Sequence, residues 1–345
     1  LVLSLKKGEM GMKHWKSFFA ATAVALAASH MVLADAIPFR ISLNTGPNHV
    51  RNIALKAFVE KLKERTAGKL DVQVFPSSQL FKGPDVPKAL AQGGIEMGVP
   101  IILYISRIVP NAGIMDLPMF FGRTIDEIHK VMDHEAGDEL NAEIEAKLKV
   151  KIIGPYLDLG HGSIFTTERP ATNLAALKGL KLRVPGSAAA RARYESLGAD
   201  AVSISFANVP IALAQKTVDG LMTTHETIRS AKLWESGLKY AIDTQGAFLQ
   251  YVPMVGNPIW KKMGPELQKA VVDSWNETVG GARALAAKRQ ASARKEGLAN
   301  GIKSIQADAK ELAAFRKRLM ARQDDIIKAV RIDPKFAARV SAAFK

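Results

Sequence analysis

One arginine within a short apolar stretch is the residue of this sequence best suited to chemistry. Residues 178–185 read KGLKLRVP, so Arg183 falls near the end of a strand predicted over residues 180–184, just before Pro185 and Gly186. A strand fixes the base of the side chain, and a guanidinium is a planar fork of donors that matches a carboxylate in shape and charge. The pattern alone favours an ordinary salt bridge at a strand end, and a carboxylate-binding site is the alternative.

Other polar and aromatic side chains could complete such a site. Asn44 ends the first predicted strand, and its amide can donate and accept, although it could instead cap that strand or form a turn. Tyr104 offers an apolar face and a polar tip. Thr223 could contact a ligand or bond to the local backbone. His161 and His225 could each donate to a ligand oxygen, or have a structural role.

The N-terminus has the three parts of a secretory signal peptide. Residues 12–16 are basic, residues 17–28 are almost wholly small or apolar, and residues 34–36 read ADA, a small-x-small cleavage site. The apolar run is too short to span a bilayer comfortably. A signal anchor or a buried helix is the alternative. We expect cleavage near Ala36 and a soluble, freely diffusing protein in the periplasm.

The composition narrows the function classes. The chain of 345 residues has a net charge of +15, contains 48% hydrophobic residues and has no cysteine. Such a charge favours acidic ligands, anionic membranes or nucleic acid. The charge is spread along the chain, only 7% of residues are aromatic, and export removes nucleic acid as a target. We therefore expect no nucleic-acid partner and no cofactor.

The hydrophobic pattern alternates between strand and helix periods. Strands are predicted over residues 37–44, 70–75 and 95–99, with helices over 50–62 and 86–92 between them, which predicts a parallel sheet. Later strands are predicted over 149–157, 163–167, 180–184, 248–255 and 302–305. Later helices are predicted over 125–148, 188–197, 206–214, 265–295, 310–330 and 334–344. Two α/β lobes with a cleft between them are expected, and the absence of a flexible linker favours a hinge.

With these residues in view, the chain resembles the solute-binding proteins of TRAP transporters, the DctP-like family. The markers are FPSSQL at residues 75–80, GIEMG at 94–98, DLP at 116–118, KGLKLRVP at 178–185, LGA at 197–199 and VDG at 218–220. The resemblance implies an α/β fold with two lobes, of the type II-like periplasmic-binding-protein class, and a long helix that crosses both lobes. It also implies delivery of a bound ligand to a TRAP membrane permease.

The resemblance assigns roles residue by residue. It implies that Arg183 binds the ligand carboxylate, that Asn44 and Thr223 line the pocket, and that Phe206 is the aromatic residue of the second lobe. Two stretches depart from the family pattern. Several members carry a further basic residue on the strand before the arginine strand; here residues 160–163, with His161 and Ser163, contain no arginine, and residues 100–104 read PIILY. These departures favour a monocarboxylate with an apolar or aromatic body over a sugar acid or a C4-dicarboxylate.

The expected organisation follows from these assignments. Residues 1–36 form the leader and signal peptide, residues 37–158 with about 249–290 the first lobe, and residues 159–248 with about 291–345 the second lobe. A monomer is expected, which closes on a small carboxylate. Asp158 is the expected partner of Arg183 in the empty state.

Enzymatic activity is not expected. The sequence has no thiol nucleophile, no Gly-x-Ser-x-Gly elbow, no phosphate-binding loop and no His-Glu-x-x-His motif. An extracytoplasmic sensing module remains an alternative, as does a hydrolase that uses unrecognised carboxylates.

Overall fold

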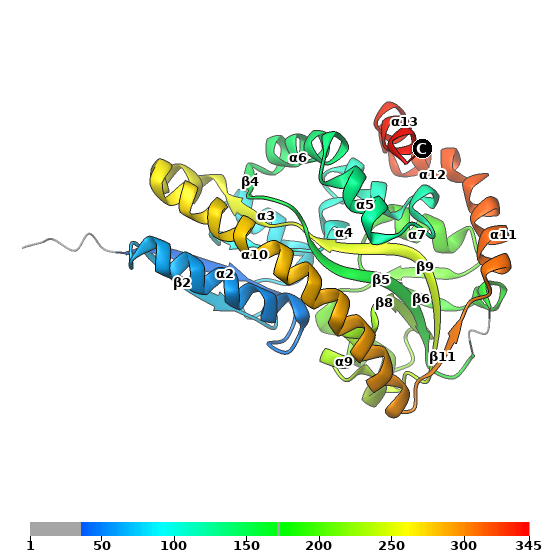
Figure 1. The fold of residues 1–345 in the computed structure, drawn as a ribbon. Coiled ribbons are helices and arrows are strands. Elements are labelled where there is room, and N and C mark those ends of the chain that lie inside the picture. The colour runs from blue at the N-terminus through cyan, green and yellow to red at the C-terminus, as the bar shows by residue number, and fades with distance from the viewer. Residues whose placement is uncertain (1–35, 171–172, 345) are drawn as a thin grey trace, which may run out of the picture. The chain divides into compact units, whose positions relative to one another are not determined.

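Two sheets organise the protein in the computed structural model, which describes residues 36–170 and 173–344. The five-stranded sheet has the order β2-β1-β3-β10-β4, and the six-stranded sheet has the order β11-β9-β5-β8-β6-β7 (Figure 1). The strands are β1 (Ile37–Ser42), β2 (Leu70–Phe75), β3 (Met97–Gly98), β4 (Val150–Ile152), β5 (Leu157–Thr166), β6 (Lys181–Val184), β7 (Asp200–Ser203), β8 (Gly220–Thr223), β9 (Tyr240–Tyr251), β10 (Met254–Gly256) and β11 (Lys303–Gln306).

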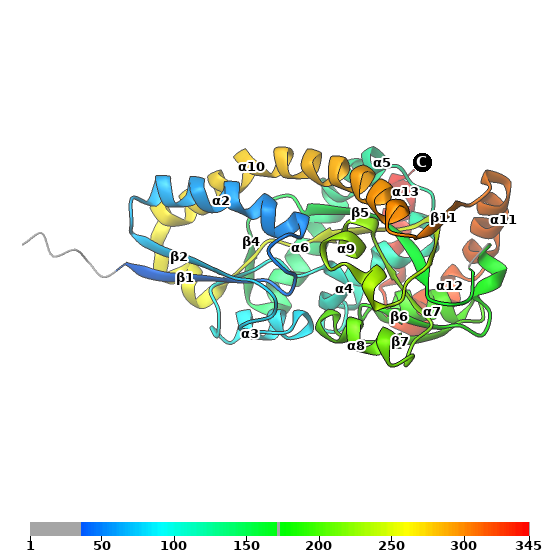
Figure 2. The same cartoon turned by 90° about the horizontal axis from the view of Figure 1, so that it is seen from below.

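Helices alternate with these strands along the chain. They are α2 (Val50–Thr66), α3 (Val86–Ala91), α4 (Ile102–Ile105), α5 (Ile125–Met132), α6 (Glu135–Leu148), α7 (Ala188–Glu195), α8 (Val209–Ala214), α9 (His225–Ser230), α10 (Asn257–Ala299), α11 (Ala309–Met320), α12 (Gln323–Val330) and α13 (Pro334–Ala343). Figure 2 shows α2 and α3 on opposite faces of the sheet that contains β1. The α/β class predicted from the sequence is confirmed.

The first sheet is built around β1. This strand pairs in parallel with β2 and β3, as the predicted alternation of strand and helix requires. Strand β10, from late in the chain, pairs antiparallel with both β3 and β4, so the sheet is mixed. The carboxyl ends of β1 and β3 meet at one edge, which brings Asn44 close to residues 99–104.

The second sheet contains the strand that carries Arg183. Strand β6 pairs in parallel with β7 and β8, so the loops after β6 and β8 leave the sheet at the same edge. Strands β5 and β9, of 10 and 12 residues, pair antiparallel. Both are longer than predicted. Register shifts in β5 between Asp158 and Gly160, and between His161 and Ser163, break the alternation that the sequence analysis relied on.

Helix α10 links the two sheets. It packs on α2 beside the first sheet and on β5 and α9 beside the second (Figure 1). It starts earlier than the predicted residue 265, because a turn with Gly264 at φ 70° joins a first segment to the rest of the helix. Glycine tolerates that left-handed backbone, and Pro265 suits the first turn of the segment that follows.

Two predicted helices are each divided in the structure. The helix expected over 125–148 is α5 followed by α6, because His134 adopts an extended backbone between them. The helix expected over 310–330 is α11 followed by α12, with a turn at residues 321–322. Neither break contains glycine or proline, so the sequence carries no strong local signal for them.

The N-terminal prediction lies outside the described residues. The signal peptide expected over residues 12–36 falls almost wholly in the range 1–35. Among the helices formed by residues 36–170 and 173–344, none combines the length and the apolar character that crossing a bilayer requires.

Candidate functional site

Elements of both sheets enclose a small cavity at the carboxyl end of β6. Its volume is about 30 Å³, which is room for only two or three water molecules. Side chains from the β1 and α4 region form one wall, those from β6, β8 and α9 another, and β5 and β9 contribute apolar residues. Five of the seven predicted ligand residues line it: Asn44, Tyr104, Arg183, Phe206 and Thr223.

Arg183 is buried in this cavity wall with only 2% of its surface exposed. Its Nε donates to the carbonyl of Ile204 at 2.8 Å. Burial lowers the pKa of Arg183, and the neighbouring Tyr104 hydroxyl opposes that effect. Within residues 36–170 and 173–344 no carboxylate pairs with this guanidinium. The salt bridge that the pattern alone favoured is therefore wrong for the described residues, and the cation is available to an anionic ligand.

The expected partner of Arg183 is engaged elsewhere. Asp158 is buried and pairs with His129 Nε2 at 2.9 Å. It also accepts a hydrogen bond from Gln250 at 2.8 Å. Asp158 precedes Leu159, which lines the cavity, and adjacent strand residues point to opposite faces of the sheet, so this carboxylate points away from the cavity. The proposed contact between Asp158 and Arg183 is wrong.

A second buried guanidinium lies directly behind Asn44. Arg51, in the first turn of α2, has no exposed surface. Its Nη1 donates to the carbonyl of Val99 at 2.7 Å, and its Nη2 donates to Asn44 Oδ1 at 2.9 Å and to Thr45 Oγ1 at 2.7 Å. Its Nε has no partner among the described residues. Burial lowers the pKa of Arg51, partly opposed by Tyr251 and Tyr104, and no carboxylate contributes.

His49 connects the two walls behind the cavity. Its Nδ1 accepts from the backbone nitrogen of Arg51 at 3.2 Å and so caps the start of α2. Its Nε2 lies 3.3 Å from Thr227 Oγ1 and 3.4 Å from the Tyr251 hydroxyl. Burial, together with Arg51 and two further arginines, lowers the pKa of His49 well below its ordinary value, so the ring is neutral at neutral pH.

Tyr104 reaches the cavity because Gly83 has no side chain. A Cβ at Gly83 would lie 2.3 Å from the Tyr104 ring and 3.1 Å from Asn44 Cγ. Real Cβ contacts do not reach so close, so a larger residue would displace the phenol or the amide. Gly83 therefore determines the shape of this wall.

Polar contacts also join α2 to α9 beside the cavity. Glu226 is fully buried, and its Oε1 accepts from the backbone nitrogen of Val50 at 2.9 Å. Arg289 on α10 lies 3.2 Å from Glu226 and also donates to the carbonyl of Asn48 at 3.0 Å. Arg229 forms a further ion pair with Glu226. These contacts hold elements of the two sheets together around the cavity.

His161 and Ser163 do not share the Arg183 cavity. They line a separate hollow of about 530 Å³ between β5, β9, α5 and α10. His161 Nε2 donates to the carbonyl of Arg123 at 2.9 Å, and Ser163 donates to Asp243 at 2.6 Å. His225 lies in the same hollow and pairs with Asp243 at 2.7 Å. Because of the shifts in β5, His161 and Ser163 point to a different face of the sheet from Leu159, which lines the Arg183 cavity.

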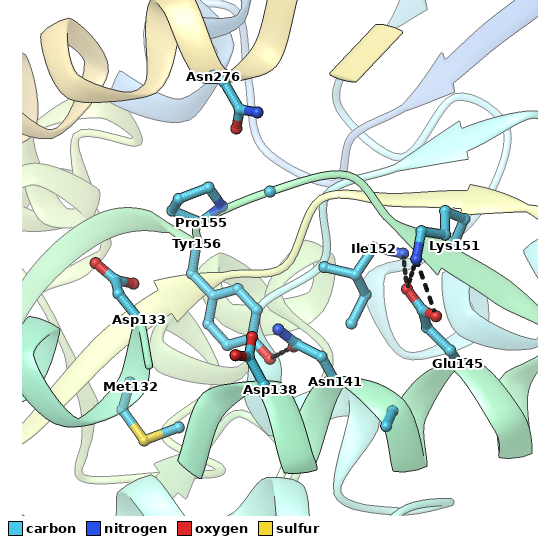
Figure 3. Close-up of a pocket in the computed structure, with 12 residues that line it drawn as sticks. Met132, Asp133, Asp138, Asn141, Glu145, Lys151, Ile152, Pro155, Tyr156 and Asn276 are labelled. Carbon is cyan, nitrogen blue, oxygen red and sulfur yellow. Dashed lines mark hydrogen bonds and ion pairs between the residues drawn. The ribbon is translucent and has the colours of Figure 1, made fainter. Parts of the chain in front are cut away.

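A third hollow, of about 470 Å³, lies beside β4, α6 and α10 (Figure 3). Figure 3 shows Glu145 facing Lys151 and the backbone nitrogen of Ile152, and these contacts are 2.9 Å each. Asp138 also lines this hollow, as does Asp133, which pairs with Arg283. Three acidic side chains and one lysine line this hollow, and two of the acids, Asp133 and Glu145, are paired with basic groups. None of the predicted ligand residues lies there.

Comparison with known proteins identifies the family. The model of the bacterial extracellular solute-binding protein family 7, DctP, matches residues 41–328. The 2,3-diketo-L-gulonate-binding periplasmic protein YiaO of Escherichia coli (strain K12) is 28% identical over 272 residues, which cover 79% of this chain and 82% of that protein. The C4-dicarboxylate-binding periplasmic protein DctP of Rhodobacter capsulatus is 28% identical over 326 residues, which cover 94% of this chain and 96% of that protein.

Solved structures show the same fold. The sugar acid binding protein DctPAm of Advenella mimigardefordensis, in complex with galactonate, aligns with a TM-score of 0.84 at 20% identity over 90% of this chain and 98% of that one. A TRAP periplasmic solute-binding protein of Sulfurospirillum deleyianum, with bound succinate, aligns with a TM-score of 0.81 at 24% identity. The alignment covers 89% of this chain and 99% of that one. The two-lobed periplasmic-binding fold with a long helix is confirmed.

This chain belongs to the bacterial extracellular solute-binding protein family 7, and its predicted membership of the DctP-like solute-binding proteins of TRAP transporters is confirmed. The ligand roles of the five cavity residues, and the residue boundaries of the two lobes, stay predictions.

Among the residues in or behind the cavity wall that the sequence analysis missed are Arg51, His49 and Tyr251. Arg51 is one of many arginines in the chain, and nothing local distinguishes it. His49 and Tyr251 meet only in the folded protein, from β9 and the loop before α2. Residues 248–255, which include Tyr251, suggested only a strand.

Proposed function

We propose that this protein is a periplasmic receptor that captures a small organic acid by hinge closure and delivers it to a TRAP membrane permease. It performs no chemistry on the ligand. The observation that carries the proposal is the pair of buried guanidiniums, Arg51 and Arg183, beside one cavity and without a carboxylate partner among the described residues.

A buried cation without a carboxylate partner is unfavourable, because neutral hydrogen-bond acceptors replace only part of its lost hydration. An anion that arrives with the ligand supplies the missing counter-charge, and this gain contributes to the binding free energy. Arg183 lines the cavity itself, so it is the group that would pair with a ligand carboxylate. A guanidinium–carboxylate pair forms two parallel hydrogen bonds and therefore also orients the ligand.

The other cavity residues supply the rest of the binding free energy. Charged hydrogen bonds contribute about 1.5–3 kcal/mol each, whereas micromolar affinity needs about −8 kcal/mol. Burial of the ligand's carbon atoms against Leu159, Leu249 and Phe206 supplies a further part. Asn44, Tyr104 and Thr223 supply polar contacts from both sides of the cavity.

Closure is the step that completes the site. Asn44 and Tyr104 belong to the half that contains the first sheet, and Arg183 and Thr223 belong to the second sheet. A ligand that contacts both halves favours the closed form only through its higher affinity for that form. The cavity of about 30 Å³ is too small for ligand entry without movement. The bonds from Glu226 to Val50 and to Arg289 form in the closed state and break when the protein opens.

The apolar side chains of the cavity fit the apolar body predicted for the ligand. The cavity of about 30 Å³ is smaller than any organic acid, so it widens when a ligand enters and its size does not discriminate between aliphatic and aromatic acids. The relatives are named for acids of several kinds, among them C4-dicarboxylates and 2,3-diketo-L-gulonate. We propose a small organic acid with an apolar body.

A thermal-shift screen tests the proposed function. The mature protein is heated with mono- and dicarboxylates, 2-oxo acids, hydroxy acids, aromatic acids and sugar acids, and each hit is confirmed by calorimetry. A ligand at one hundred times its Kd stabilises the folded form by about 2.7 kcal/mol. Saturable binding of one acid class supports the proposal. Binding of no acid, or of uncharged solutes only, contradicts it.

A further inference from the structure

The side-chain amide of Gln290 on α10 joins two segments of the cavity wall from outside the cavity. Gln290 lies in the hollow of about 530 Å³ on the other face of β5. Its Nε2 donates to the carbonyl of Leu159 at 2.6 Å, and its Oε1 accepts from the backbone nitrogen of Glu226 at 3.1 Å. One amide therefore ties both β5 and the start of α9 to the long helix.

Both backbone groups need a partner from outside their own element. Leu159 is the residue that the register shift between Asp158 and Gly160 skips, so no residue of β9 lies opposite it. Glu226 is the second residue of α9, and the first N–H groups of a helix have no partner within it. Buried backbone groups are rarely left unpaired. The amide therefore stabilises both segments in their observed positions.

Only an amide in one orientation satisfies both partners. A carbonyl accepts and an N–H donates, so the nitrogen of Gln290 must face Leu159 and the oxygen must face Glu226. A carboxylate would lack the donor. Gly160 permits the close approach, because a Cβ there would lie 3.0 Å from Gln290 Cγ. Its φ of 121° also favours glycine.

The two segments that Gln290 holds carry groups of the cavity and of the closing contact. Leu159 and Thr227 line the cavity. Glu226 is fully buried and accepts from the backbone nitrogen of Val50, at the start of α2, at 2.9 Å. Movement of the start of α9 would therefore shift a cavity residue and the carboxylate that meets the first half.

The preceding residue of α10 contacts the first half. Arg289 donates to the carbonyl of Asn48 at 3.0 Å and lies 3.2 Å from Glu226. Consecutive residues of the long helix thus contact both sides of the closing contact, Arg289 on the first half and Gln290 on the second. Glu226 lies between them and is bonded to both.

We infer that Gln290 is a positioning residue for ligand capture, which holds Leu159 and the start of α9 in the geometry that the closed form requires. This inference rests on the proposed function. Gln290 does not line the Arg183 cavity, so it acts through these two segments. A wall that is already held in its bound geometry loses less conformational entropy when the ligand arrives, and affinity is higher for that reason.

Two glutamines on α10 provide a matched pair of variants. Gln290→Glu keeps the shape and one acceptor but places a second oxygen against the Leu159 carbonyl. Gln268→Glu makes the same change at an amide that donates to the carbonyl of Trp260 at 2.7 Å, roughly 33 Å away along the helix axis. By calorimetry with the best acid of the screen, we expect Gln290→Glu to weaken binding roughly tenfold or more. Gln268→Glu should leave the Kd within about twofold of the wild type.

Melting curves of the ligand-free variants separate positioning from general stability. A merely structural amide would lower the melting temperature in Gln290→Glu and leave the Kd unchanged. That result would overturn the inference and leave the proposed function intact. Failure of every acid to bind the wild type would remove both.

A double-mutant cycle tests whether the amide acts through α9. Gln290→Met removes both hydrogen bonds without adding a charge at this half-buried position, and its effect on Kd is measured in the wild type and in Glu226→Gln. We expect the fold-loss of affinity to be at least about threefold smaller in the Glu226→Gln background, because the carboxylate that Gln290 positions is then absent. Equal losses in the two backgrounds would contradict the inference.

Discussion

Replacing Arg183 by methionine should weaken ligand binding strongly without destabilising the empty protein. Arg183→Met keeps an unbranched side chain of similar length and removes only the guanidinium. The ligand-free protein loses one hydrogen bond, from Nε to the Ile204 carbonyl at 2.8 Å. It also loses the unfavourable burial of a cation that has no carboxylate partner among the described residues. These effects oppose each other, so the melting temperature should change little.

The loss of affinity should be large. A bidentate pair between Arg183 and a carboxylate contains two charged hydrogen bonds, each of about 1.5–3 kcal/mol. Their sum of about 3–6 kcal/mol corresponds to a loss of roughly 10² to 10⁴ in affinity. Arg183→Lys is the matched control, because it keeps the charge and loses the planar fork. It should fall between the wild type and Arg183→Met.

Calorimetry with the best acid of the screen, together with melting curves with and without that acid, measures both quantities. The reasoning is refuted if Arg183→Met binds the acid within a few-fold of the wild type. It is also refuted if the ligand-free variant melts far below the wild type, because Arg183 would then be a structural group and not an unpaired cation held for a ligand.

Three further predictions concern the groups around the cavity. Burial lowers the pKa of His49, so below about pH 6.5 the open form binds a proton that the closed form excludes. In calorimetric titrations, ligand affinity should be constant above about pH 7 and fall below about pH 6.5, more steeply than in His49→Asn. Equal pH profiles for the wild type and His49→Asn would contradict this role. Glu226→Gln removes the charge that Arg229, Arg289 and the Val50 nitrogen share, so affinity should drop roughly tenfold or more, whereas an unchanged Kd would count against a closing contact. Gly83→Ala should drive the Tyr104 ring into the cavity and weaken ligand binding at least tenfold. Gly280→Ala is the neutral control, because a Cβ at Gly280 meets no atom within 4 Å. Equal Kd values for these two variants would disprove the role of Gly83.

Local patterns in the sequence were enough to predict the strand that carries Arg183 and the first parallel strands. Alternating apolar residues over β1 and β2, and a helical stripe along α2, depend only on neighbouring positions. Strands β7 and β8 were not predicted, although they have four residues each like β6; β7 contains only two apolar residues, and β8 begins at Gly220. The breaks after α5 and α11 were missed because they contain no glycine or proline.

The family resemblance extended the prediction to the cavity. It placed Asn44, Phe206 and Thr223 beside Arg183, and the structure brings all of them to one cavity. His161 and Ser163 were predicted to bind the ligand too, but with the shifted register of β5 they line a different hollow. A bulge changes the face of the sheet to which the following side chains point. It depends on how two strands pair, and the sequence of one strand alone does not specify that pairing.

The sequence by itself therefore determined which groups are present: a guanidinium at a strand end, an amide after the first strand, apolar walls and a chain with the α/β rhythm of its family. Only the tertiary structure decided which way those groups point. Arg51 meets Asn44, seven residues earlier, and Val99, whereas His49 meets Thr227 and Tyr251, which are distant from it in the chain. Hydrogen-bond direction depends on which partner lies opposite, so the arrangement of the cavity wall arises from packing and not from residue type.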